Sequence, residues 1–325
     1  MIAIVLIAIA AGSASGLMFA SIVSGALISL LLFYLAPLPL MVAAIGWGPL
    51  SATIGGIAAA CGLGMMFGFP YCIAFTLTVA LPAWWLGHLV LLGRPVLHSG
   101  AGNGAAPVAP DLEWYPVGRI LLWIAGFAVL TTTAALLTLG ADAETIIGTL
   151  RRGLVRILDP RDGAPPGNAE RWIEALVVIA PAAAAIVAMM TLTLNLWLAA
   201  KITATSGRLH RPWPDLKTAA LPPMTLAALS VALAFCFVGG LAAMLAQIAA
   251  TVLTMAYGFT GFAVLHTLTL SLKSRAFWLS CAYATVMVFG WPMLAIVAVG
   301  LADAVFGLRQ RYLRSRPPPL PVSRT

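Results

Sequence analysis

Few polar side chains that could do chemistry stand within the long apolar segments of this chain. The four candidate substrate-binding residues are Asn195, Gln247, Tyr257 and His266. An amide such as that of Asn195 could hydrogen-bond a substrate or a neighbouring helix. Gly258 and Gly261 could unwind their helix and expose carbonyl groups to a ligand, and the alternative is a merely flexible helix. Asp303 precedes Arg309 by six residues, which predicts an interfacial ion pair or a helix cap.

The motifs of common enzymes and metal sites are missing from the sequence. There is no HExxH, and no P-loop GxxxxGK[ST] that would let the chain power itself with ATP. The four histidines do not have the spacing of metal ligands. We therefore expect no enzymatic activity, no cofactor and no metal.

The composition indicates where these residues must lie. Hydrophobic residues make up 62% of the 325 residues and charged residues only 9%, whereas a soluble domain carries roughly 25% charged residues. This excludes a cytosolic enzyme, a secreted domain and a disordered chain. The net charge of +8 comes from bases beside the apolar runs. We interpret these bases as contacts with membrane lipids that orient the protein, and we expect no nucleic-acid partner.

The apolar runs predict an all-α fold, a polytopic transmembrane helix bundle of about eight helices, with a range of eight to ten. We divide the chain into an amino-terminal four-helix block (1–92), a cytoplasmic linker (93–117), a carboxy-terminal transmembrane region (118–306) and a basic, proline-rich tail (307–325). The first block divides into spans 2–24, 26–46, 49–68 and 71–92. Further spans are expected at 118–140 and 172–200, with two or three helices in 219–306.

The number of helices near the carboxy terminus stays open at this point. A total of eight would make part of 239–272 a re-entrant or interfacial piece. A total of ten would split 276–306 at Gly290-Trp291-Pro292. We favour eight, with nine as a further alternative.

The bases also predict how the chain is oriented. Five of the 18 lysines and arginines lie in 141–174, which leaves 18 − 5 = 13 elsewhere. The positive-inside rule therefore places 141–174, with an amphipathic helix on the membrane surface, outside the cell. The linker 93–117 and the basic loop 201–217 are then cytoplasmic. We expect a multi-pass protein of the bacterial cytoplasmic (inner) membrane.

Small residues recur every four positions on two of the predicted helices. The first helix carries Ala8, Gly12, Gly16, Ala20 and Ser24, and the third carries Ala52, Gly56, Ala60, Gly64 and Gly68. Residues four apart share one helix face, and small residues let another helix approach closely. The first stripe is a candidate helix-docking face for a transmembrane partner, and packing between the protein's own helices is the alternative.

Several short patterns resemble a known family. The segments Leu32–Pro39, Gly46–Pro49 and Leu81–Gly87, together with Gly300-Leu301-Ala302-Asp303 followed by Arg309, resemble the YybS-like predicted membrane proteins, a bacterial family of unknown function. The resemblance runs in patches over most of the chain. It implies a membrane protein, and it implies no activity.

A second resemblance concerns residues 37–68, where a Gly-Pro break precedes a glycine-rich helix. This stretch is similar to the substrate-binding S components of energy-coupling factor transporters. In those proteins a small-residue face on the first helix docks a transmembrane coupling subunit, which implies that role for the first stripe. The present chain is longer than a typical S component and has the extra segment 141–174.

These observations lead to two hypotheses of function. The first is a membrane component that binds or transports a small molecule and is powered by a partner ATPase module. The alternative is a non-catalytic membrane scaffold or biogenesis factor that engages partners through its arginine-rich loops and tail.

Overall fold

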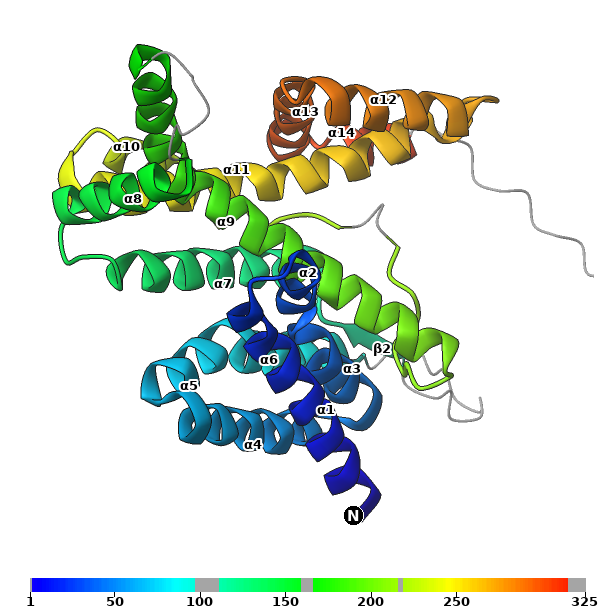
Figure 1. The fold of residues 1–325 in the computed structure, drawn as a ribbon. Coiled ribbons are helices and arrows are strands. Elements are labelled where there is room, and N and C mark those ends of the chain that lie inside the picture. Colours follow the sequence, from blue (N-terminus) through cyan, green and yellow to red (C-terminus); the bar gives the residue numbers. More distant parts are fainter. Residues whose placement is uncertain (1, 97–110, 159–165, 216–218, 315–325) are drawn as a thin grey trace, which may run out of the picture.

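The computed structural model describes residues 2–96, 111–158, 166–215 and 219–314 (Figure 1). Within these residues the fold is helical apart from one pair of short strands, so the all-α prediction is confirmed. Seven helical segments are long and apolar enough to cross a membrane, and an eighth is added if a bent pair near the carboxy terminus counts as one span. This agrees with the expected bundle of about eight helices.

The amino-terminal block contains four spans, as predicted. The first is α1 (Ile2–Ala20) with the 3-10 turn η1 (Ser21–Ser24), and the third is α4 (Pro49–Phe67). The second is divided into α2 (Leu27–Leu35) and α3 (Pro37–Trp47), and the fourth into α5 (Phe69–Phe75), the π-helical turn η2 (Thr76–Ala80) and α6 (Leu81–Leu91). The breaks before α4 and α5 lie at Gly48 and Gly68, whose φ angles of 95° and 94° favour glycine.

The linker after this block contains an unpredicted strand pair. β1 (Gly93–Val96) pairs with β2 (Asp111–Trp114) in antiparallel register, with Arg94 opposite Glu113. These two side chains form an exposed ion pair of 2.6 Å. Gly100, Gly102, Gly104, Pro107 and Pro110 of the predicted linker lie outside the described residues.

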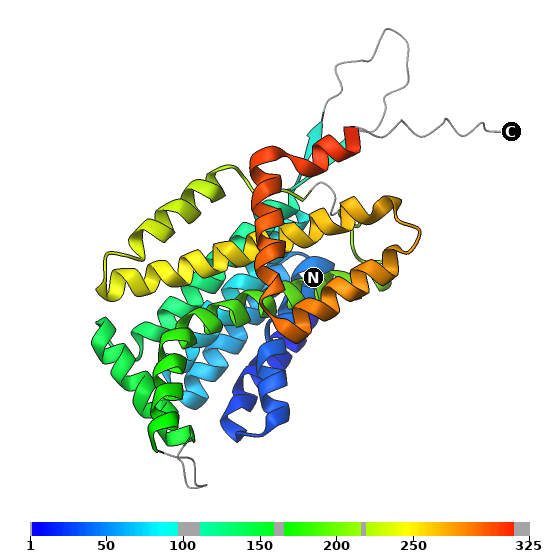
Figure 2. The same ribbon diagram turned by 90° about the horizontal axis from the view of Figure 1, so that it is seen from above.

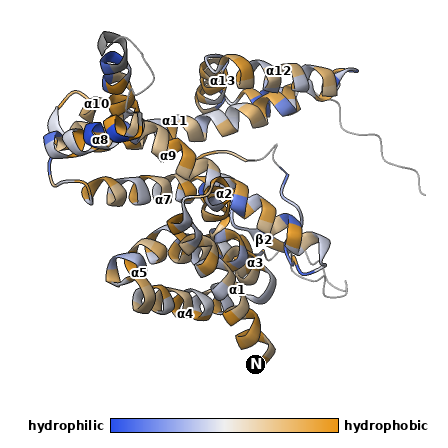
Figure 3. Ribbon diagram, viewed as in Figure 1, coloured by the Kyte–Doolittle hydropathy of each residue, from blue (hydrophilic) through white to orange (hydrophobic). Residues whose placement is uncertain are grey.

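The predicted amphipathic helix is present as α8 (Ala143–Leu158), which follows the span α7 (Val117–Leu137). Ile146 on its apolar face is fully buried, while Arg151 on its polar face pairs with Glu174 at 2.6 Å. Figure 3 shows the hydrophilic residues gathered on and near this helix, in contrast to the mostly hydrophobic spans.

The next span, α9 (Pro166–Thr205), is longer than the predicted 172–200. The prediction ended the helix before Lys201 because of its charge. In the structure the helix continues to Thr205, and the Lys201 ammonium lies 4.2 Å from the centre of the Trp213 ring.

The carboxy-terminal region holds more helices than expected. The described residues from 219 onward form α10 (Met224–Phe235), α11 (Gly240–Leu268) with the 3-10 turn η4 (Thr269–Ser271), α12 (Arg275–Phe289), α13 (Pro292–Phe306) and α14 (Leu308–Arg314). The idea of a re-entrant piece in 239–272 is wrong, since α11 and η4 form one continuous span. The alternative break at Gly290 is present, with a φ of 70°. The tail beyond Arg314 lies outside the described residues.

Helix α13 lies across the middle of α11 (Figure 2). Glycines permit this crossing: a Cβ atom at Gly261 would come within 2.0 Å of the Ile296 carbonyl oxygen, and one at Gly300 within 2.0 Å of that of Tyr257. Gly258 and Gly261 therefore serve close helix packing, and the helix that they could have unwound is continuous.

Arg211 ties together the loops at one end of the bundle. Its buried guanidinium donates to the carbonyl of Tyr115 at 2.9 Å and to that of Val90 at 3.4 Å. Burial lowers the pKa of Arg211 below its usual range, although the group remains charged. The loops before α7 and after α9 thus lie at the same end of the bundle, which agrees with the predicted shared side. Lys217 of the predicted basic loop lies outside the described residues.

Candidate ligand pocket within the helix bundle

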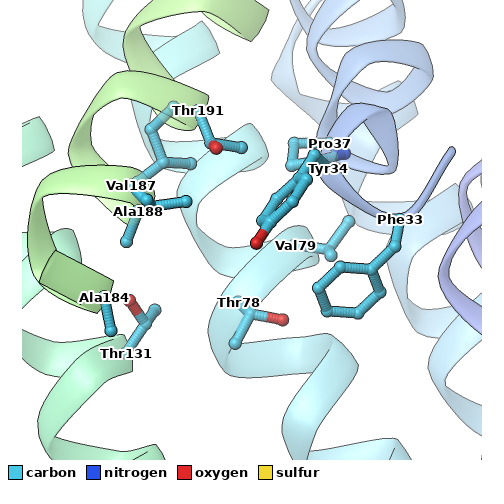
Figure 4. Close-up of a pocket in the computed structure, with 11 residues that line it drawn as sticks. Phe33, Tyr34, Pro37, Thr78, Val79, Thr131, Ala184, Val187, Ala188 and Thr191 are labelled. Carbon is cyan, nitrogen blue, oxygen red and sulfur yellow. The ribbon is translucent and has the colours of Figure 1, made fainter. Parts of the chain in front are cut away.

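A half-open pocket of about 240 Å³ lies between helices from both halves of the chain (Figure 4). The α2–α3 junction and η2 form one side of it, and α7 and α9 form the other. The residues that line it are Phe33, Tyr34, Pro37, Thr78, Val79, Thr131, Ala184, Val187, Ala188, Thr191 and Leu192.

A π-helical turn shapes one wall of this pocket. Pro82 has no amide hydrogen and so cannot donate to the carbonyl four residues back, that of Thr78. Next to it, the Leu81 amide donates to the Thr76 carbonyl five residues back, which is the π-helical pattern. The extra residue per turn places Thr78 and Val79 on the pocket wall.

A proline break shapes the part of the same side that α2 and α3 form. Pro37 and Pro39 interrupt the helical hydrogen bonds between α2 and α3. Beside this break, Asn195 Nδ2 donates to the Tyr34 carbonyl at 2.9 Å and to the Thr191 carbonyl of its own helix at 2.8 Å. Asn195 is therefore a bridge from α9 to α2, placed behind two residues that line the pocket.

The pocket is apolar with a few hydroxyl groups. Thr78 and Thr131 donate their hydroxyl hydrogens to the helix carbonyls of Ala74 and Ala128, so their oxygens remain available as acceptors. Figure 4 shows the Tyr34 ring projecting into the space between η2 and α9. No charged side chain is among the described residues that line the cavity. It can hold an uncharged, mostly apolar molecule that carries a hydrogen-bond donor.

Asn195 has one unsatisfied atom. Its side chain is 1% exposed, and Oδ1 has no hydrogen-bond partner among the described residues. A buried acceptor without a donor costs on the order of 1–3 kcal/mol. The geometry supports the role of Asn195 as a bridge between helices, and Oδ1 is a further acceptor next to the pocket.

The structure does not bring the other three predicted binding residues together with Asn195. Gln247, Tyr257 and His266 all lie on the continuous helix α11. At about 1.5 Å rise per residue, Gln247 and His266 are roughly 28 Å apart along the axis. Gln247 is exposed and Tyr257 is buried. A single small molecule cannot reach all four side chains.

The predicted docking face of α1 packs largely within the chain. A Cβ atom at Gly12 would come within 2.2 Å of the Gly55 carbonyl oxygen on α4, and one at Gly16 would lie 3.5 Å from the Ala59 Cβ atom. Ala8 is fully buried, Ala20 is partly buried and Ser24 is exposed. In this structure the alternative interpretation, packing between the protein's own helices, describes the stripe from Ala8 to Gly16.

Asp303 takes both of the roles that the sequence suggested. Its Oδ2 pairs with the Arg309 guanidinium at 2.7 Å, and its Oδ1 accepts the Arg309 amide at 2.8 Å. Arg309 also donates to the Ala219 carbonyl at 2.7 Å. The pair is nearly buried and fixes the bend of 68° between α13 and α14.

The pocket residues themselves were missed by the sequence reasoning. Thr78, Thr131 and Tyr34 carry no charge and follow no motif. One available signal was Pro82, since a proline within a predicted span must disturb the hydrogen bonds of the preceding turn. The pairing of that turn with α9, about 100 residues later, had no signal in the sequence.

The comparison with protein families concerns the second half of the chain. Residues 167–304 match the profile of a family described as "Predicted membrane protein (DUF2232)". The match covers less than half of the chain. It includes the α9 wall of the pocket and leaves out the amino-terminal block. The chain shows no significant similarity to a curated protein or to a solved structure.

Taken with the apolar helices, this match decides the class of protein. The chain is a multi-pass membrane protein. The family description states no activity, so a hypothesis about function has to rest on the geometry of the pocket.

Proposed function

We propose that the protein binds a small, uncharged and largely apolar molecule in the pocket between α2, η2, α7 and α9, as a binding or transport component of a bacterial inner membrane. The observation that supports this is the cavity itself. It is formed by helices distant in sequence, lies where two helices depart from regular geometry, and carries hydroxyl groups but no charged lining residue.

The ligand chemistry follows from the lining. Acceptor oxygens of Thr78 and Thr131 favour a ligand that donates a hydrogen bond, such as an alcohol or amide. The apolar surfaces of Phe33, Val187 and Leu192 favour a hydrocarbon body. A carboxylate or phosphate would lose its hydration without gaining a counter-charge, so we expect anions to be excluded.

The test is to fill the pocket. Purified wild-type protein should retain a small organic molecule that mass spectrometry detects after denaturation. Ala188→Phe, which places a ring in the cavity, should lose it. The control is Val178→Phe, on the same helix at a position that is 72% exposed. This variant should still retain the molecule. Equal retention by wild type and Ala188→Phe would contradict the proposal.

Transport would further require energy from a partner, because the chain has no P-loop. The similarity to S components supports a transmembrane coupling subunit with an ATPase module. That subunit would have to use a surface other than the Ala8–Gly16 part of α1, which contacts α4. Cross-linking in native membranes should recover an ATPase. Recovery of assembly factors instead would favour the scaffold hypothesis.

A further inference from the structure

Two hydroxyl groups in the pocket have no hydrogen-bond partner within the described chain. Thr78 and Thr131 donate to carbonyls of their own helices at 2.7 Å and 3.3 Å, as threonines in helices often do. Tyr34 and Thr191 also line the pocket, but their hydroxyl groups bond to none of the described residues. Figure 4 shows the Tyr34 hydroxyl pointing into the space between η2 and α9. The pocket therefore offers free O–H donors as well as acceptor oxygens.

These free hydroxyl groups favour a ligand that carries an alcohol oxygen. Tyr34 and Thr191 both lie within membrane spans, where there is no water to bind a hydroxyl group. A hydroxyl group has one hydrogen to donate and two lone pairs that accept. The oxygen of an alcohol can therefore accept from Tyr34 and Thr191. Its own hydrogen can be donated to the oxygen of Thr78 or Thr131.

The mouth of the pocket, formed by Tyr34 and Val187, opens on the outer surface of the bundle. These two lining residues are 37% and 41% exposed, whereas Val79 at the inner wall is buried. Leu30, one turn before Tyr34, and Met190, one turn after Val187, are exposed on the same helix faces. Apolar side chains exposed along a membrane span face the hydrocarbon of the bilayer. The pocket therefore opens sideways into the lipid.

The depth of the pocket indicates the leaflet onto which it opens. At about 1.5 Å per residue, Tyr34 is roughly 10 Å from the start of α2 and Thr131 roughly 9 Å from the end of α7. The end of α7 leads to α8. The start of α2 lies at that same end of the bundle, because the other end of its span, Trp47, contacts Arg208 at 4.6 Å beside the Arg211 loops. The mouth thus opens in the leaflet on the α8 side.

The pocket is too small to enclose a whole lipid molecule. Its volume of about 240 Å³ is below the roughly 300–1,000 Å³ of pockets that enclose drug-sized ligands. It can enclose the polar end of a long molecule. The rest of that molecule would pass through the mouth and remain in the hydrocarbon.

We propose that the ligand is a lipid-soluble alcohol with a hydrocarbon tail, which enters the pocket sideways from the leaflet on the α8 side with its hydroxyl group first. Tyr34 and Thr191 determine this specificity by donating to the ligand oxygen. The tail leaves the pocket through the mouth, beside Val187. This inference rests on the function proposed above, and it names the class of ligand and the route of entry.

The experiment is photo-cross-linking of the full-length protein in lipid nanodiscs. The probe is hexadecanol with a diazirine near its hydroxyl end, and the comparison probe carries a methyl group in place of the hydroxyl. Peptide mass spectrometry measures the labelling of pocket residues. In the wild type the alcohol should label the pocket about fivefold more than the hydrocarbon probe does, because only the alcohol forms hydrogen bonds there.

Two variants each remove one free hydroxyl group. Tyr34→Phe and Thr191→Val should each lower labelling by the alcohol about fivefold and leave labelling by the hydrocarbon probe unchanged. The matched control is Thr193→Val on the same helix as Thr191, because the Thr193 hydroxyl is bonded to the Met189 carbonyl and Thr193 does not line the pocket. This control should label like the wild type with both probes.

A further pair of variants tests the sideways entry. Val187→Trp narrows the mouth, so it should slow labelling by alcohol that is delivered from donor vesicles. Leu194→Trp adds the same ring on the same exposed face of α9, two turns away, and should not change the rate.

The outcomes that contradict this proposal differ from those that contradict the proposed function. Equal labelling by the two probes, or no loss in both Tyr34→Phe and Thr191→Val, would overturn the alcohol as ligand. An unchanged rate in Val187→Trp would overturn the sideways entry. If Ala188→Phe still loses the retained organic molecule, the pocket remains a binding site and only this inference fails. If Ala188→Phe retains that molecule, the proposed function fails too.

Discussion

Asn195 illustrates how a single polar side chain serves a membrane-embedded fold. Its amide nitrogen donates to the Tyr34 carbonyl at 2.9 Å, next to the break between α2 and α3. In hydrocarbon, a carbonyl without a donor has no water to bind, so a side-chain amide can stabilise an interrupted helix. The bridge explains why an asparagine stands among apolar residues of α9, and why the same residue lies beside the pocket.

Replacement of Asn195 by leucine should therefore destabilise the bundle. We expect a loss of about 1 kcal/mol in the free energy of unfolding, since the bond between helices disappears while the side-chain volume is roughly kept. Unfolding by denaturing detergent measures this. Thr193→Val, which removes only a hydroxyl bonded to the Met189 carbonyl of its own helix, should change stability little. Equal effects of the two substitutions would argue against the bridge.

At the scale of elements, glycine determines which helices cross. Small residues let α1 approach α4 and let α13 cross α11, with backbones closer than side chains would allow. The four-residue spacing identified the face of α1 that packs closely, but it could not identify the partner of that face. Gly12 lies against Gly55, a residue outside the predicted stripe of α4, whereas Gly56 of that stripe faces Ala80 of η2.

A methyl group added at the α11–α13 crossing should force the helices apart. Gly261→Ala would place its Cβ near the Ile296 carbonyl oxygen, and we expect about 1–3 kcal/mol of destabilisation. Thermal unfolding in detergent measures the effect. Gly126→Ala is the matched control within α7, because no atom lies within 4 Å of an added Cβ there. A harmless Gly261→Ala would mean that the helices do not cross at this point.

In the whole molecule, the number of spans between two loops determines whether the loops lie at the same end of the bundle. The contacts of Arg211 support the resulting arrangement. This side chain bonds to Val90 and Tyr115, so it joins two loops that the base distribution assigns to the cytoplasm. Helix α8 lies between α7 and α9, at the opposite end of α7 from Tyr115. Helix α8 and the loops joined by Arg211 therefore lie at opposite ends of the bundle.

This arrangement predicts the labelling of single cysteines. In a variant without the native cysteines, a cysteine at Gly148 of α8 should react with an impermeant maleimide added to intact cells. Cysteines at Arg94 and Gly207 should react only after the membrane is opened, because the basic loops stay in the cytoplasm. Opposite labelling of positions 94 and 207 would contradict the contacts of Arg211.

The sequence by itself determined the all-α membrane fold, the four amino-terminal spans, the amphipathic α8 and the Asp303–Arg309 pair. These features depend on hydropathy and on residues close in sequence, which set helices whatever their neighbours are. Only the tertiary structure decided that Thr78, Thr131 and Tyr34 meet in one cavity and that Gln247 and His266 lie far apart. Which helices become neighbours depends on close packing of surfaces, and uncharged residues distant in sequence carry no pattern that announces it.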